Sequence, residues 1–256
     1  MSEPIGKTGV MTELEKFMFD AAGYLVVPDA LTPAQTAACI AAAERCYASQ
    51  PKDQWNQLGT AYETEPALEE LIDLPAMLPK VRALLGDYFH LQSSWLTQVP
   101  PRSPALGYHQ DGYNPYPFRN LAPTTPLLQL RIGYVLTDMS QPGIGNLVFV
   151  PGSHKTFAPM PGKLNAGDVP SEHLLTAKPG TAILFHQGVW HASGPNRQDY
   201  PRVMMHMVYS PPWLIKRQRN SQAFLDRLPP LRRALLDNWL DSANSYNNMK
   251  PLPFGD

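Results

Sequence analysis

The chain has 256 residues, a formal net charge of −1 at neutral pH and 28 prolines, so it fits one large domain with stiff loops. This net charge gives no sign of a basic surface that would bind nucleic acid or a membrane. No apolar run approaches membrane-spanning length. The expected partner is a small molecule, and the sequence leaves the oligomeric state open.

The first predicted elements are a helix and a short strand. Glu13–Ala22 has helical spacing, with Leu14, Phe17 and Met18 on one face. Gly23 ends this helix, and the apolar run Tyr24–Val27 predicts a strand. In this segment a helix is therefore followed directly by a strand.

A second helix begins at Thr32, which is an N-cap residue, with Pro33 at the first helical position and Gln35 at the capping-box position. It should run to about residue 49, and shorter helices are expected around 66–72 and 76–86. Cys39 and Cys46 would lie roughly 10 Å apart along the second helix, beyond disulfide reach. We therefore expect a reduced, cytoplasmic protein.

From Phe89 onward the sequence consists of short, β-rich apolar runs broken by Pro and Gly, which predicts a sandwich or jelly roll. The expected strands are 89–92, 94–99, 128–137, 146–150, 182–185 and 202–209. The proline-rich stretches 114–126 and 156–170 are long enough to cover a substrate. A polar, basic helix from Ser221 to Trp239 closes the chain.

No linker or repeat divides the chain. We therefore expect a single domain over residues 1–256, mainly β with flanking helices. Its parts would be N-terminal helices at about 11–86, a jelly-roll core at about 89–210 and a C-terminal helix at about 221–240.

Two sequence motifs that lie far apart in the chain predict a metal centre. His109 and Asp111 are two apart, so on an extended segment their side chains share a face. His191, which follows the strand 182–185, would complete a set of two imidazoles and one carboxylate. That set leaves adjacent positions open on non-haem Fe(II). A His-x-Asp pair alone occurs by chance in many chains, where the histidine is an ordinary surface or core residue.

Arg202 strengthens the interpretation because it begins the apolar run that follows His191. If the strands 182–185 and 202–209 pair, His191 and Arg202 can face one cavity. A guanidinium there would hold a carboxylate in a bidentate contact and stay charged when desolvated. The alternative for Arg202 is an ion pair at the rim of the fold.

These residues resemble the phytanoyl-CoA dioxygenase family of Fe(II)/2-oxoglutarate oxygenases. The resemblance begins at 23–28, continues through His109-Gln110-Asp111 and 146–155, and ends at 191–196 with Arg202. It implies a double-stranded β-helix (a cupin-like jelly roll), Fe(II) held by His109, Asp111 and His191, and 2-oxoglutarate and O2 as co-substrates. It also implies that Arg202 and Ser193 hold 2-oxoglutarate and that Gln110 approaches it.

The carboxylate limits the reaction that the resemblance implies. Halogenating relatives carry Ala or Gly in its place, so Asp111 favours hydroxylation or another oxidation of a C–H bond. Two other classes stay open: a cupin-like metalloenzyme that does not use 2-oxoglutarate, and a non-catalytic binding protein on the same fold. The first would need the metal ligands without Arg202 or Ser193, and the second would need neither.

Several further side chains are candidates for a substrate wall. Aromatic residues near the metal phrases or on the expected core strands form one group, although ordinary core packing explains each equally well. They are Tyr108, Tyr113, Tyr116, Phe118, Trp190, Trp95 and Tyr134. Arg131 lies in an apolar strand, so it must point outward or into a polar cavity, where it could anchor a substrate.

The remaining signals favour structural roles. We expect His186 not to be a ligand, His206 to be packed within its strand and His154 to lie in a turn. The basic run 216–219 predicts a solvated face more than a CoA site. Without a peroxisomal address at 253–256 or a CoA patch, we expect a small metabolite or natural product as the substrate.

Overall fold

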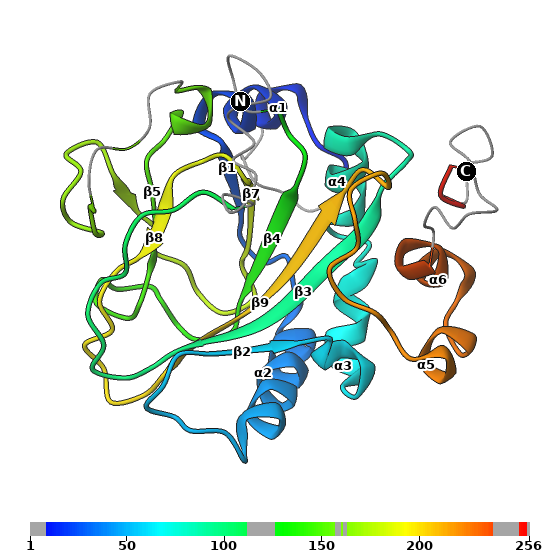
Figure 1. Ribbon diagram of the computed structural model, residues 1–256, viewed down its shortest axis with the longest axis horizontal. Coiled ribbons are helices and arrows are strands. Elements are labelled where there is room, and N and C mark those ends of the chain that lie inside the picture. Colours follow the sequence, from blue (N-terminus) through cyan, green and yellow to red (C-terminus); the bar gives the residue numbers. More distant parts are fainter. Residues whose placement is uncertain (1–8, 112–125, 157–159, 161–162, 238–250, 255–256) are drawn as a thin grey trace.

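The computed structural model describes residues 9–111, 126–156, 160, 163–237 and 251–254. Within these ranges no helix is both long and apolar enough to cross a membrane. The centre of the described chain is an antiparallel sheet with helices on one side (Figure 1).

Two sheets make up the β part of the fold. The larger has six strands in the order β1 (Tyr24–Val27), β7 (Ala182–His186), β4 (Leu130–Val135), β9 (Arg202–Ser210), β3 (His90–Val99) and β2 (Asn56–Gly59), and every neighbouring pair is antiparallel. The smaller has the order β6 (His173–Leu174), β5 (Leu147–Phe149) and β8 (His191–Ser193). The two sheets pack together through a shared apolar cluster that includes Phe149, Phe185 and Met204. The expected jelly roll is thus confirmed.

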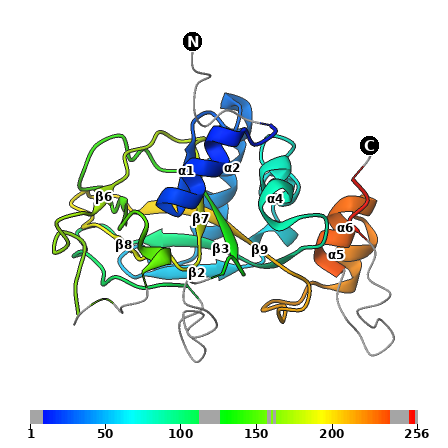
Figure 2. The ribbon, with the colours of Figure 1, turned by 90° about the horizontal axis from the view of Figure 1, so that it is seen from above.

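The helices cover the other face of the larger sheet (Figure 2). They are α1 (Glu13–Ala22), α2 (Pro33–Tyr47), α3 (Pro66–Glu69) and α4 (Leu78–Leu85). Alternate strand residues point toward them: Leu130, Ile132 and Tyr134 of β4 lie in the same core cluster as Phe19 and Ala42 of the helices. The residues between them, including Arg131, therefore face the smaller sheet.

Local sequence explains where the first two helices begin. Thr12 and Glu15 form a reciprocal capping box at α1, and Thr32 and Gln35 form another at α2, as the sequence predicted for the second. Gly23 ends α1 with φ 84°, a left-handed conformation that glycine adopts without strain. Cys39 and Cys46 both lie in α2 and are free thiols.

Three predicted elements differ in detail from the structure. The closing helix is two short ones, α5 (Gln222–Asp226) and α6 (Pro230–Asp237), because the Pro229-Pro230 pair interrupts helical hydrogen bonding, and residues 238–239 lie outside the described ranges. The segment 66–72 is α3 followed by a 3₁₀ turn. The runs 89–92 and 94–99 are one strand, β3, with an irregularity between Leu91 and Ser93.

The strand pairing also differs from the expectation. β7 and β9 do not pair with each other, because β4 lies between them and pairs with both. Three short strands were not predicted from the sequence: β2, β6 and β8. The substrate-covering stretches lie partly outside the described residues: 114–125 and residues 157–159 and 161–162 are not described.

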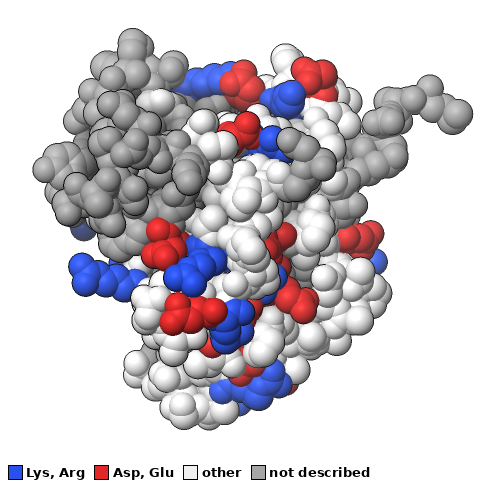
Figure 3. Space-filling model, turned by 90° about the vertical axis from the view of Figure 1, so that its right-hand side faces the viewer, with Lys and Arg blue, Asp and Glu red and all other residues white. Residues whose placement is uncertain are grey.

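Charge is distributed without a dominant sign on the face shown in Figure 3. Among the described residues of that face, basic and acidic side chains lie next to one another. In the basic run near the end of the β part, Arg217 and Arg219 are exposed, whereas Lys216 is half-buried and donates a 2.9 Å hydrogen bond to Asn220 Oδ1. The run is therefore only partly the solvated face that was expected.

Candidate metal centre

His109, Asp111 and His191 come together in the structure. One ligand atom from each lies within 4.8 Å of the others. Backbone pairing produces this arrangement: His109 and His191 exchange two N–H···O bonds of 3.0 Å, and the Asp111 N–H donates to the carbonyl of Gln187 at 2.8 Å. The segment ending at Asp111 thus lies beside β8, which sets the two imidazole rings 4.3 Å apart.

The two imidazoles are oriented by the same local contact. His191 Nδ1 lies 2.9 Å from the carbonyl of Val189, and His109 Nδ1 lies 3.4 Å from the carbonyl of Gly107, in each case two residues earlier. A carbonyl only accepts, so Nδ1 of His191 carries the proton and Nε2 keeps its lone pair. Burial, and then His109, lowers the pKa of His191 to about 3, so the ring is neutral at physiological pH.

The two oxygens of Asp111 have different surroundings. Oδ1 lies 2.8 Å from Nη2 of Arg131, whereas Oδ2 is buried without a hydrogen-bond partner among the described residues. Burial raises the pKa of Asp111, but electrostatic attraction, chiefly to Arg131, outweighs it and holds the pKa below its ordinary value. Asp111 is therefore an ionised carboxylate whose Oδ2 is available to bind a metal ion.

These residues fit a divalent metal ion. A buried, ionised oxygen without a partner is costly unless a cation satisfies it. Two imidazoles beside it complete a nitrogen and oxygen donor set of the kind that suits Fe(II), and the other nitrogen of each ring faces a backbone carbonyl, as is usual for metal ligands.

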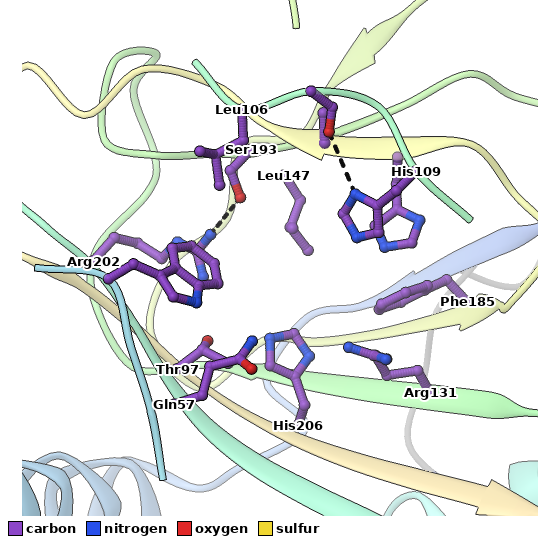
Figure 4. A pocket seen from close by; sticks show the side chains of 14 residues that line it. Gln57, Thr97, Leu106, His109, Arg131, Leu147, Phe185, Ser193, Arg202 and His206 are labelled. Carbon is purple, nitrogen blue, oxygen red and sulfur yellow. Dashed lines mark hydrogen bonds between the residues drawn. The ribbon is translucent and has the colours of Figure 1, made fainter. Parts of the chain in front are cut away.

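The two histidines of the cluster line a cavity of about 230 Å³ between the two sheets (Figure 4). His109, His191 and Ser193 come from the side of the smaller sheet, and Arg131, Arg202 and His206 come from the larger one. The lining residues are Trp55, Gln57, Thr97, Leu106, Gly107, His109, Arg131, Leu147, Phe185, His191, Ala192, Ser193, Arg202 and His206.

Arg202 is a fully buried cation in the wall of this cavity. Its Nε donates to the carbonyl of Gly145 at 2.9 Å, and its Nη2 donates to Ser193 Oγ at 2.8 Å. Burial lowers its pKa to about 10, which leaves the group protonated at neutral pH. Within the described residues its Nη1 makes no hydrogen bond. Although β7 and β9 are not paired, His191 and Arg202 share the cavity because Ser193 of β8 reaches Arg202.

Two of the residues predicted to contact co-substrate or substrate have other partners. Gln110 does not line the cavity; its side-chain amide donates a 2.5 Å hydrogen bond to the carbonyl of Gly188. Tyr108 is half-buried, and its hydroxyl donates to Glu172 Oε2 at 2.6 Å. Both contacts fix the backbone on either side of His109.

Tyr134 was predicted to reach the cavity, and this was wrong. It is three residues from Arg131 on β4, so the two side chains point to opposite faces, and Tyr134 is fully buried in the core beneath the helices. Trp190 is buried and Trp95 is half-buried beside His206 in the register of β3 and β9, and neither lines the cavity. Tyr113, Tyr116 and Phe118 lie outside the described residues.

Two predictions about cavity residues also need correction. Arg131 lines the cavity as a charge in an apolar strand should, but its guanidinium is paired with Asp111. His206, expected to be packed within its strand, is buried yet lines the cavity wall (Figure 4). Its ring fits because Gly133 lies opposite on β4, where an added Cβ would be 3.1 Å from Cε1 of His206. The position of His206 could have been predicted from the sequence, since Arg202 and His206 are four residues apart on one strand and so share a face.

The other histidines behave as expected. His154 lies in a 3₁₀ turn, and its Nε2 contacts the carbonyl of Asp20 at 3.0 Å. The ring of His186 lies against that of His154, tilted by 42° with centroids 4.9 Å apart, and its Nδ1 accepts a 2.9 Å hydrogen bond from the Gly188 N–H. Neither belongs to the metal cluster.

Comparison with known proteins places this geometry in a family. The family model described as phytanoyl-CoA dioxygenase matches residues 19–204. The ectoine dioxygenase of Sphingopyxis alaskensis is 25% identical over 227 residues, which cover 75% of this chain and 73% of the relative. The ectoine dioxygenase of Nocardia farcinica is 24% identical over 228 residues, which cover 75% of both.

Solved structures share the fold. HygX from Streptomyces hygroscopicus, with nickel and 2-oxoglutarate bound, superimposes with a TM-score of 0.69 at 16% identity and covers 82% of this chain and 91% of its own. EctD from S. alaskensis, with 2-oxoglutarate and 5-hydroxyectoine, gives a TM-score of 0.63 at 20% identity and covers 88% of each chain.

Proposed function

Because the chain belongs to the phytanoyl-CoA dioxygenase family, we propose that it is an Fe(II)- and 2-oxoglutarate-dependent dioxygenase that oxidises a C–H bond of a small molecule. The observation that carries this proposal is a single cavity with two complementary ends. One end holds His109 and His191, which cluster with Asp111 behind them, and the other holds the buried Arg202–Ser193 pair.

In this proposal His109, Asp111 and His191 hold the iron. Each imidazole presents Nε2, because its Nδ1 is turned toward a backbone carbonyl. Asp111 presents Oδ2, the oxygen without a partner among the described residues. When bound, iron would supply the activation of O2, coupled to the oxidative decarboxylation of 2-oxoglutarate to succinate and CO2.

Arg202 and Ser193 hold the far carboxylate of 2-oxoglutarate. A guanidinium that is buried and still charged attracts a carboxylate much more strongly than an exposed one, because water does not screen it. The contact between Arg202 Nη2 and Ser193 Oγ, at 2.8 Å, orients both donors before the co-substrate arrives. A cupin-like enzyme that does not use 2-oxoglutarate would have no use for this buried pair.

The presence of Asp111 supports hydroxylation, or another C–H oxidation, over halogenation. A halogenating site needs the position of the carboxylate ligand for a halide. Here the carboxylate is present, ionised and held by Arg131.

A small metabolite or natural product is the proposed substrate class. The named relatives are ectoine dioxygenases, and HygX has also been solved with hygromycin B bound. Polar side chains such as Gln57, Thr97 and His206 line the cavity and suit a substrate that forms hydrogen bonds better than a fatty acyl chain.

Succinate release tests the proposal directly. Purified protein with Fe(II), ascorbate and 2-oxoglutarate should release succinate slowly alone and faster with one member of a panel of amino-acid, osmolyte and natural-product candidates. His109→Ala is the matched control and should release none. Succinate release by His109→Ala at the wild-type rate would contradict the assigned centre.

A further inference from the structure

The ion pair between Arg131 and Asp111 distinguishes the two oxygens of a metal ligand. Arg131 Nη2 lies 2.8 Å from Oδ1, and Oδ2 faces Nε2 of His191 at 3.9 Å. The side chains of Arg131 and Asp111 are only 17% and 11% exposed, so water competes little for this contact. Sequence reasoning assigned Arg131 to the substrate, whereas the structure gives it a protein partner.

We propose that Arg131 is a positioning residue that makes Asp111 a one-oxygen metal ligand. The inference rests on the proposed function. An octahedral ion offers six positions: two histidines and one carboxylate oxygen take three, and a chelating 2-oxo acid takes two. One position is then left for O2. A carboxylate bound through both oxygens would fill it, and Arg131 prevents this by occupying Oδ1.

The fold keeps Arg131 in place for this role. It lies on β4, a central strand that pairs with β7 on one side and β9 on the other, opposite Phe185 and Val208. Its guanidinium carbon lies 5.6 Å from the centroid of the Phe185 ring, which packs against the flat group. A guanidinium on a rigid strand is a better support for a ligand than one on a loop.

A competing explanation is that Arg131 only substitutes for a cation. In that case the guanidinium neutralises Asp111 while the cluster holds no metal, and metal binding must displace it. The two explanations predict opposite signs for metal affinity. Removing a support weakens binding, whereas removing a competitor strengthens it.

Nickel affinity of Arg131→Met therefore decides between them. Ni(II) binds without turning over, so isothermal titration of the full chain measures the centre apart from activity. We expect a loss of about 10- to 100-fold, the usual cost of removing a group that supports a ligand, because the lost orientation of Asp111 outweighs a second contact from its freed oxygen. An affinity equal to or tighter than the wild type would overturn the proposal.

Three further variants make the result specific. Arg219→Met removes an exposed arginine and so matches the loss of charge; it should keep the wild-type Ni(II) affinity. Arg131→Lys keeps the charge with a less suited donor geometry and should lose less than Arg131→Met. It also keeps the test available if Arg131→Met does not fold. On an Asp111→Asn background, Arg131→Met should cost no further affinity, because the support acts through the carboxylate.

The same titrations separate failure of this inference from failure of the proposed function. If His109→Ala also keeps full Ni(II) affinity, the metal centre itself is wrong. If His109→Ala loses affinity and Arg131→Met does not, only the role of Arg131 is wrong. The Ni(II)-loaded Arg131→Met protein should also bind 2-oxoglutarate more weakly than the loaded wild type, because a two-oxygen Asp111 competes for the chelating positions.

Discussion

His191 Nε2 lies 3.9 Å from Asp111 Oδ2, although the two residues belong to different segments of the chain. This distance is too long for a direct hydrogen bond. Two bonds of about 2.1 Å to a shared ion can span it. The geometry is thus that of two ligands with room for an ion between them, and it leads to predictions about each end of the cavity.

Removing one ligand should abolish turnover without unfolding the protein. His109 is exposed, so His109→Ala leaves no cavity in the core, and the backbone bonds that join His109 to His191 remain. Circular dichroism and thermal unfolding should match the wild type within a few degrees, while Ni(II) binding and succinate release disappear. A variant that still binds Ni(II) with wild-type affinity would place the centre elsewhere.

At the other end of the cavity, Arg202→Lys should weaken 2-oxoglutarate binding by roughly 1.5–3 kcal/mol, the range for a charged hydrogen bond. The charge stays, but the ammonium cannot contact the Gly145 carbonyl, Ser193 Oγ and a carboxylate in the geometry of the planar fork. The KM for 2-oxoglutarate should rise much more than the KM for the prime substrate. Ser193→Ala should show the same selectivity with a smaller effect. An unchanged KM for 2-oxoglutarate in Arg202→Lys would mean that another residue anchors the co-substrate.

The pairing of Arg131 with Asp111 also predicts how the protein responds to halide. Wild-type protein should give hydroxylated or desaturated product and no chlorinated product at high chloride. In Asp111→Gly the hydroxylation should be lost, and the guanidinium of Arg131 then faces the vacated position without its carboxylate.

If Asp111→Gly forms products whose identity or amount depends on chloride, that dependence should therefore vanish in the double variant Asp111→Gly/Arg131→Met. Mass spectrometry of the products formed in chloride and in sulfate buffer measures this dependence. A chlorinated product from the unmutated protein would overturn the assignment as a hydroxylase.

His90 should make stability depend on pH far from the cavity. It is buried on β3, its Nε2 lies 2.9 Å from Ser210 Oγ, and burial lowers its pKa to about 4. The unfolded chain binds a proton near the ordinary value of 6.5, whereas the folded chain does not. Stability contributed by the neutral ring is present above about pH 6.5 and is lost as the pH falls toward 4.

The size of that loss is on the order of 3 kcal/mol for a shift of this extent. Urea unfolding between pH 7 and 4.5 should show a steeper loss of stability in the wild type than in His90→Gln. Equal slopes for the two proteins would show that the ring is not held neutral in the folded state.

The sequence predicted those parts of the fold and site that depend on nearby residues. The capping box at Thr32, the end of α1 at Gly23 and the His-x-Asp phrase involve residues within a few positions of one another. The strand β8 was not predicted, since a three-residue strand containing His191 has no alternating pattern and exists because β5 pairs with it. β2 is a polar strand at the edge of the larger sheet, and only its pairing with β3 defines it.

Two errors at the site could have been avoided by counting along the strands. Tyr134 is an odd number of residues from Arg131, so the two cannot share a face, whereas His206 is an even number from Arg202 and must. The partner of Arg131 could not be predicted in this way. Asp111 lies outside the strands that pair with β4, and only the packing of the two sheets brings the residues together.

The segment from Leu106 to Asp111 is joined to residues 187–193 by a short ladder of backbone hydrogen bonds. Leu106 donates to Ser193, His109 and His191 exchange two bonds, and Asp111 donates to Gln187. All three proposed iron ligands and the serine of the co-substrate pair therefore lie on one ladder. Its local opening would release them together, while a metal ion bound across it would act as a crosslink. Metal loading should then slow amide hydrogen exchange at His109, Asp111 and His191 in concert and leave the central strand β9 unchanged.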